Sequence, residues 1–299
     1  MSKDKAMNAV AKNPEFKIGG DLTVCRMGYG AMQLTGPGVW GPPEDEENAR
    51  AVLRRAVELG VNFIDTADVY GPHDNERIIQ QALNPYPSAL VIGTKAGLVR
   101  AGPATPENPG ISMNGSGQHI RNAIEGSLTR LGLDCIDLYQ LHRVDPAIPI
   151  EDTMEVFRAL RDEGKIRHIG LSEVGVDDIK RAQSVVDIAT VQNVYNLVTR
   201  KHEDVLTCCE QAMIAFIPFW PLHSGRLATS EAVREIAGRT GADNAQVSLA
   251  WLLQKSPSII LIPGTSSVEH LEQNMRALDL DLSAAEMGAL EQLGGSQLD

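Results

Sequence analysis

The sequence predicts an α/β protein: a single (β/α)8 TIM barrel whose bottom is capped by an N-terminal β-hairpin. Short, almost continuously apolar runs recur along the chain and alternate with segments whose apolar residues lie three and four apart. Continuous apolar strands are typical of a parallel sheet covered by helices, because both strand faces are buried. Eight such strand–helix units fit into the 299 residues of the chain, and about 250 residues is usual for this barrel.

The elements follow in order from the N-terminus. A Gly-Gly-Asp turn separates two β-prone runs in Phe16–Met27, which predicts the hairpin. The first barrel strand is expected at Met27–Leu34, before a loop rich in glycine and proline. The other strands are expected at Val61–Asp65, Ala89–Lys95, Ile136–His142, Ile166–Ser172, Thr190–Asn193, Ile214–Phe219 and Ile259–Pro263. Helical spacing predicts helices at Glu46–Leu59, Asn75–Leu83, Gly117–Leu131, Glu151–Glu163, Asp177–Val186, Asp204–Met213, Glu231–Thr240, Ala245–Gln254, Val268–Ala277 and Leu282–Leu293.

No linker composition divides the chain, so residues 16–299 are predicted to form one domain after a disordered tail at residues 1–15. The main alternative architecture is an open, doubly wound sheet. That fold commonly carries a GxGxxG turn after its first strand, and this chain has none there. The irregular segment Arg100–Ser116 is too long for a plain connection and is expected to face the substrate.

Composition excludes several functional classes. The net charge of −12 disfavours binding to nucleic acids or to anionic membranes. The four cysteines lack CxxC spacing, so we expect reduced thiols in a cytoplasmic protein. No apolar run approaches the ~18 residues of a membrane span, and the N-terminus lacks the apolar core of a signal peptide. His119, His168 and His202 show no paired ligand spacing, so no metal is expected.

Titratable side chains stand where the predicted strands end. Asp65 ends one strand and Tyr70 follows five residues later, while Lys95 and His142 end the next two strands. Because the carboxyl ends of barrel strands share one face, where the active sites of such barrels lie, we expect these four side chains to meet.

The four residue types suit proton transfer to a reduced carbonyl group. A tyrosine with a pKa near ~10 is a poor donor unless its phenolate is stabilised. Lys95 beside Tyr70 would lower that pKa, and Asp65 would hold Lys95 charged and in place. His142 can donate a hydrogen bond to the substrate oxygen. No side chain delivers a hydride, so a nicotinamide cofactor is required.

The chain resembles the aldo-keto reductase family from about Phe16 to Leu293. The resemblance rests on motifs in the family's order: DTAxxYG at Asp65–Gly71, Lys95, YxLH at Tyr139–His142, GLS at Gly170–Ser172, QNxYN at Gln192–Asn196 and IPGTSSVEHLEQN at Ile262–Asn274. It implies that Asp65, Tyr70, Lys95 and His142 are a catalytic tetrad for NAD(P)H-dependent reduction of small aldehydes or ketones. Tyr70 would be the proton donor.

The resemblance also implies cofactor contacts. Ser172 and Gln192 would bind the nicotinamide carboxamide, and Phe219 would stack on its ring. Glu173 replaces the asparagine common in the family and cannot donate a hydrogen bond as that amide does. The remaining expected contacts are Pro221, Leu222, Ser224, Gly225, Gly264, Thr265, Ser266, His270, Gln273 and Asn274.

NADP(H) is the expected cofactor, with NAD(H) as the alternative. The segment Gly264–His270 contains no lysine or arginine to hold a 2′-phosphate, and Glu269 adds a negative charge. Ser266 and Glu269 have the spacing of a capping box at the start of the last barrel helix.

Tyr29, Met32, Trp40 and Trp220 are candidate walls of the substrate pocket. Little chain follows the last helix, which favours an open pocket for a small or aromatic aldehyde, with pyridoxal as one candidate. Two other functions stay open: a regulatory subunit that binds the nucleotide with little turnover, and an aldolase that forms a Schiff base on Lys95. We expect a monomer or a weak homo-oligomer.

Overall fold

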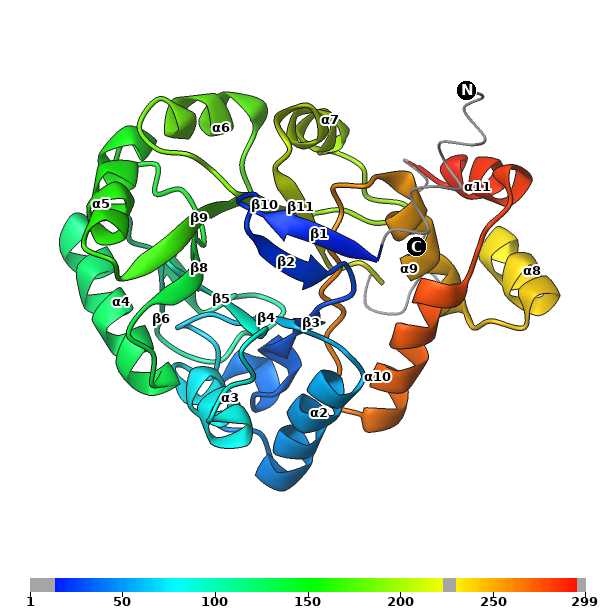
Figure 1. Ribbon diagram of the computed structural model, residues 1–299, viewed down its shortest axis with the longest axis horizontal. Coiled ribbons are helices and arrows are strands. Elements are labelled where there is room, and N and C mark those ends of the chain that lie inside the picture. The colour runs from blue at the N-terminus through cyan, green and yellow to red at the C-terminus, as the bar shows by residue number, and fades with distance from the viewer. Residues whose placement is uncertain (1–13, 223–229, 295–299) are drawn as a thin grey trace.

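The computed structural model describes residues 14–222 and 230–294, and its centre is a curved parallel sheet (Figure 1). Seven strands run in the order β11-β10-β9-β8-β5-β4-β3. Their bounds are β3 (Tyr29–Gly30), β4 (Phe63–Asp65), β5 (Val91–Ala96), β8 (Ile136–Leu141), β9 (Ile166–Ser172), β10 (Thr190–Val194) and β11 (Ala215–Phe219).

An eighth extended segment joins the two edges of this sheet. Parallel bridges pair Phe216 with Ile259 on one side and Met27 with Leu261 on the other. The Gly28 N–H donates to the Leu261 carbonyl at 2.8 Å, and the Phe216 N–H donates to that of Ser258 at 2.8 Å. The ring is therefore closed, and the predicted (β/α)8 barrel is confirmed. The predicted strand Ile259–Pro263 forms only isolated bridges.

Helices surround the sheet, as Figure 1 shows. Asp45 begins the first of them by accepting the Asn48 N–H at 2.9 Å, and Gly132 ends α4 in the left-handed conformation (φ 66°). Their bounds are α2 (Glu46–Glu58), α3 (Asp74–Leu83), α4 (Gly117–Leu131), α5 (Ile150–Asp162), α6 (Val176–Gln183), α7 (Glu203–Ala212), α8 (Glu231–Thr240), α9 (Asn244–Lys255), α10 (Val268–Met275) and α11 (Ala284–Glu291).

The predicted N-terminal hairpin is present and closes the bottom of the barrel. Strands β1 (Glu15–Ile18) and β2 (Leu22–Cys25) pair antiparallel and cross the barrel opening in Figure 1. Ile18, Leu22 and Val24 are buried in one cluster with apolar residues of the barrel strands. Glu15, which we assigned to the N-terminal tail, belongs to β1.

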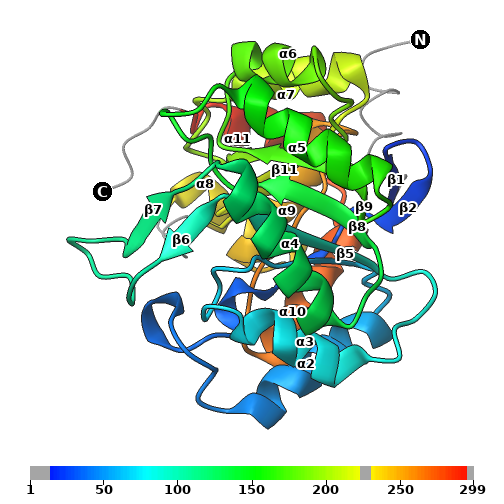
Figure 2. The same ribbon diagram turned by 90° about the vertical axis from the view of Figure 1, so that its left-hand side faces the viewer.

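Part of the segment Arg100–Ser116 that was predicted to be irregular forms a second hairpin. Strands β6 (Leu98–Arg100) and β7 (Ile111–Met113) pair antiparallel, and Figure 2 shows them projecting from the body of the barrel. Arg100 ties this hairpin to the turn after β4, because its Nε donates to the Val69 carbonyl at 3.1 Å. Strands of only three residues contain too few side chains for a strand pattern, so this hairpin could not be predicted from the sequence.

Within residues 14–222 and 230–294, no helix is both long and apolar enough to cross a lipid bilayer. The same residues contain no group of three or more His, Cys, Asp or Glu side chains placed to hold a metal ion.

Candidate active site

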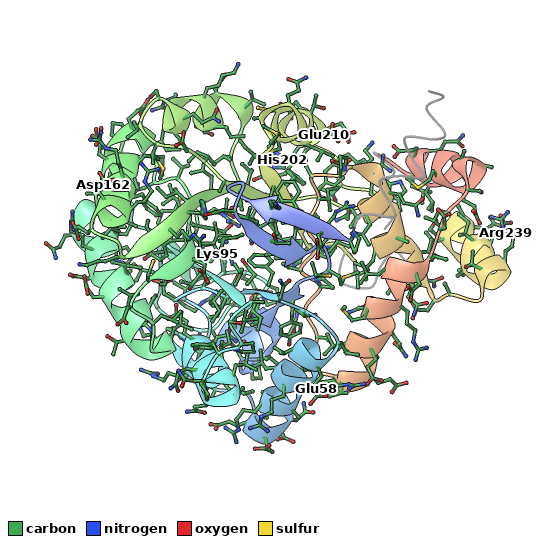
Figure 3. The ribbon with its side chains drawn as sticks, viewed as in Figure 1. Glu58, Lys95, Asp162, His202, Glu210 and Arg239 are labelled. Carbon is green, nitrogen blue, oxygen red and sulfur yellow. The ribbon has the colours of Figure 1, made fainter. Side chains whose placement is uncertain are left out.

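The four predicted catalytic side chains meet at one end of the barrel. Asp65 is the last residue of β4, Lys95 lies near the end of β5, His142 follows β8, and Tyr70 lies in the turn after β4. Figure 3 shows Lys95 inside the ring of strands. All four are buried, and Lys95 is completely so. Charged groups buried this deeply need partners.

Asp65 and Lys95 are those partners for each other. The Lys95 Nζ donates to Asp65 Oδ2 at 2.6 Å and to the Thr66 carbonyl at 2.8 Å. The other carboxylate oxygen, Asp65 Oδ1, accepts the side-chain amides of Gln192 at 2.9 Å and of Gln140 at 3.1 Å. The lysine is therefore held in one position by an acid that is itself held by two amides.

Tyr70 stands between the lysine and the histidine. Its hydroxyl lies 3.4 Å from Lys95 Nζ, within reach of a weak hydrogen bond. Its ring meets that of His142 edge-on, with 5.8 Å between centroids and 80° between planes. A phenol that touches an ammonium on one side and an imidazole on the other can exchange a proton with a group bound beside it.

The net shift in the pKa of Tyr70 is opposite to the one we predicted. Burial raises this pKa, and the negative charge of Asp65 adds to the effect, whereas Lys95 and Arg143 lower it only partly. The hydroxyl consequently stays protonated at neutral pH. It is in the correct state for a proton donor and in the wrong state for a base.

Lys95 and His142 take the protonation states that complement this donor. Burial alone would lower the pKa of Lys95, but the negative charge of Asp65 and the hydrogen bonds to Asp65 and Tyr70 raise it above its ordinary value, so Lys95 is charged. Burial, with the nearby charges of Lys95, Arg143 and Arg100, holds the pKa of His142 well below its usual range. The imidazole is therefore neutral and can donate one N–H.

A cavity of about 520 Å³ opens beside these residues. Asp65, Tyr70 and His142 lie in its wall with six of the predicted cofactor residues: Ser172, Gln192, Phe219, Pro221, Leu222 and Gly264. The walls thus combine an aromatic face with hydroxyl and amide groups, as a site for a flat, polar ring requires.

Of the other predicted cofactor residues, those that the structure describes do not line this cavity. Thr265 and Ser266 precede α10, His270, Gln273 and Asn274 lie within it, and Ser224 and Gly225 fall outside the described residues. The predicted capping box is wrong: Ser267, one residue later, caps α10 by accepting the His270 N–H at 3.3 Å, and its backbone is extended there. The contacts of the α10 residues with a nucleotide remain predictions.

Of the predicted pocket walls, Met32 and Trp220 line the cavity, whereas Tyr29 and Trp40 do not. Tyr29 is fully buried in the core between strands and helices, and its hydroxyl donates to the Thr265 carbonyl at 2.6 Å. Neighbouring strand residues face opposite sides of a sheet, so Tyr29 points outward next to Gly30, which lines the cavity. Trp40 is 39% exposed in its loop.

Glu173 does not face the cavity. Its backbone adopts the left-handed region (φ 54°), and its carboxylate accepts the Val194 N–H at 2.7 Å and Lys201 Nζ at 3.2 Å. Nearby His202, whose Nε2 lies 3.6 Å from the carboxylate, acts together with these two groups to overcome the effect of burial and lower the pKa of Glu173 to about 2. The acid therefore ties the turn after β9 to β10, and the predicted contacts of Ser172 and Gln192 with a carboxamide remain predictions.

Gln140 and Arg143 are two of the site residues that were missed from the sequence. Gln140 supports Asp65, and its place two residues before His142 on the same strand face was the signal that could have found it. Arg143 lines the cavity directly after His142. It lies beyond the end of β8, so the alternation of strand residues does not indicate where its side chain points.

The fold and site together define a closed α/β barrel with a lysine-supported tyrosine at the carboxyl ends of its strands. The aldo/keto reductase family model matches residues 26–294, so the chain belongs to the aldo/keto reductase family.

Its relatives agree with this assignment. An uncharacterized oxidoreductase of Schizosaccharomyces pombe is 45% identical over 299 residues, covering 99% of this chain and 96% of that protein. Pyridoxine 4-dehydrogenase of Escherichia coli is 42% identical over 278 residues, which cover 91% of this chain and 96% of that protein. An aldo-keto reductase from Klebsiella pneumoniae, solved in complex with NADPH, matches this structure with a TM-score of 0.79 at 29% identity. The match covers 94% of this chain and 95% of that one.

Proposed function

We propose that this protein is an NADP(H)-dependent oxidoreductase that reduces the carbonyl group of a small aldehyde or ketone to an alcohol. The observation that carries this proposal is the buried chain of contacts from Asp65 through Lys95 to Tyr70, with neutral His142 against the tyrosine ring at the cavity. The solved relative that binds NADPH supports the choice of cofactor.

The cavity fits a nicotinamide. Phe219 offers an aromatic face for the ring, and the Ser172 hydroxyl can bond to the carboxamide. Gln192 has its Nε2 committed to Asp65, so its Oε1 is the atom that would accept from the carboxamide nitrogen. Among the described residues, buried His142 Nδ1 has no hydrogen-bond partner.

Bound NADPH would supply the hydride, and the side chains would handle the proton. The neutral imidazole of His142 donates an N–H to the carbonyl oxygen and orients it. The Tyr70 hydroxyl gives its proton to that oxygen as negative charge develops there. Lys95 stabilises the phenolate that is left, and Asp65 keeps Lys95 charged throughout. The negative charge that would arrive with the hydride thus ends on the Tyr70 oxygen, 3.4 Å from the Lys95 ammonium that stabilises it.

The substrate is a compact carbonyl compound. About 520 Å³ must hold both the nicotinamide end of the cofactor and the substrate, which leaves room for a small or single-ring aldehyde. Pyridoxal is one such candidate, supported by the relative that is a pyridoxine 4-dehydrogenase.

The test is oxidation of NADPH and of NADH against a panel of carbonyl compounds that includes pyridoxal. Tyr70→Phe removes only the proton donor, so we expect turnover to fall by about 10²- to 10⁴-fold while NADPH affinity, followed by tryptophan fluorescence, changes less than about twofold. Tyr86→Phe is the matched control, because Tyr86 bonds to the Leu131 carbonyl away from the cavity. Turnover retained in Tyr70→Phe would remove Tyr70 from this role.

A further inference from the structure

Arg143 is a charged residue of the cavity that the proposed proton transfer does not use. Its Nη1 donates to the Ser172 hydroxyl at 2.9 Å and to the His142 carbonyl at 2.5 Å. Its guanidinium carbon lies 5.6 Å from the centroid of the Phe219 ring. Arg143 therefore contacts the aromatic face and the hydroxyl that would receive the nicotinamide.

Arg143 has no ion-pair partner among the residues that the structure describes. No carboxylate lies within ion-pair distance of it in residues 14–222 and 230–294. Asp65 pairs with Lys95, and Glu173 pairs with Lys201, so the charge of Glu173 acts on Arg143 only from beyond ion-pair distance. Burial lowers the pKa of Arg143, but a guanidinium remains charged at neutral pH.

We propose that Arg143 makes this site bind the reduced, uncharged nicotinamide in preference to the oxidised, positively charged one. The inference rests on the proposed function, since it concerns the nicotinamide end of the same cavity. The oxidised ring carries a unit positive charge and would share the cavity wall with the guanidinium, whereas the reduced ring carries none. Repulsion therefore falls on the oxidised cofactor alone, which weakens its binding and favours its release.

Arg143 also has to give up its contacts with Ser172 and Phe219 when either form of the cofactor enters. The cost of that displacement is the same for the two forms, so it cancels in the ratio of their dissociation constants. What remains in the ratio is the charge effect. Two like unit charges in the wall of one cavity, at an effective dielectric constant between that of bulk water and that of a protein surface, should change this ratio by about five- to tenfold.

The experiment is equilibrium titration of the full-length protein with NADPH and with NADP⁺, read by calorimetry without any substrate. In Arg143→Gln, which removes the charge, we expect the ratio Kd(NADP⁺)/Kd(NADPH) to fall about five- to tenfold. Arg143→Lys keeps the charge and should keep the ratio within about twofold. Arg54→Gln is the matched control, because Arg54 is half-exposed on α2 and pairs with Glu47.

Each outcome is decisive. A ratio in Arg143→Gln within twofold of the wild-type ratio, or an equal fall in Arg143→Lys, overturns the inference. If Arg143→Gln does not fold, the ratios of the wild-type protein and of Arg143→Lys decide. The inference is overturned if the wild-type site does not prefer NADPH, or if the lysine variant loses that preference. Failure of the proposed function would look different, because the wild-type protein would then bind neither form.

Discussion

Substitution of Asp65 by asparagine should destabilise this protein more than any exposed ion-pair change. The carboxylate receives three donors: Lys95 Nζ on one oxygen, and the amides of Gln140 and Gln192 on the other. Asparagine has the same shape but only one oxygen. Whichever way its amide is turned, its NH₂ group faces a donor, and the buried ammonium loses its counter-ion.

The magnitude follows from that burial. Removing one partner of a buried ion pair costs about 3–5 kcal/mol, which for a chain of this size corresponds to a fall in Tm of roughly 5–8 °C. The matched control is Glu47→Gln on the surface of α2, where Glu47 pairs with Arg50 and Arg54. Exposed pairs of that kind contribute about 0–1 kcal/mol.

Unfolding in urea and by heat, followed by circular dichroism, measures both variants. The double variant Asp65→Asn/Lys95→Met removes both charges, so it should be more stable than Asp65→Asn alone by at least about 1 kcal/mol. The reasoning is refuted if Asp65→Asn loses no more stability than Glu47→Gln, or if removing Lys95 as well makes the protein less stable still.

Two further predictions concern pH. The pKa of His142 is lowered and that of Tyr70 is raised, so the two limbs of the pH–rate profile should lie outside the ordinary values of ~6.5 and ~10. The kcat for reduction should therefore be level from about pH 6.5 to 9.5. A fall in stopped-flow rates between pH 8 and 6.5 would contradict this. The pKa of Glu173 is lowered to about 2, so its carboxylate stabilises the fold fully above the pKa of the unfolded state, near ~4.3, and loses that contribution as pH falls toward 2. The difference in stability between wild type and Glu173→Gln should therefore be smaller at pH 3 than at pH 7. An equal difference at the two pH values would contradict this.

The meeting of Asp65, Tyr70, Lys95 and His142 could be predicted from the sequence, because these residues stand at places that local patterns mark. Asp65, Lys95 and His142 each end an apolar run, and barrel topology brings all such ends to one face. The N-terminal hairpin and most helices were likewise predictable, since turn residues, caps and apolar spacing are properties of neighbouring residues.

Only the tertiary structure determined the charge states and the contacts that depend on residues far apart in the chain. The pKa of Tyr70 rises because burial outweighs the charge of Lys95, and neither quantity can be read from the residues around Tyr70. The left-handed backbone of Glu173 turns its carboxylate toward β10. Arg143 stands over Phe219, which is 76 positions later in the chain, only because β8 and β11 share one closed barrel. Residue types and periodicity therefore specify which groups reach the active-site face, whereas their charge states and mutual contacts arise only when the ring of strands closes.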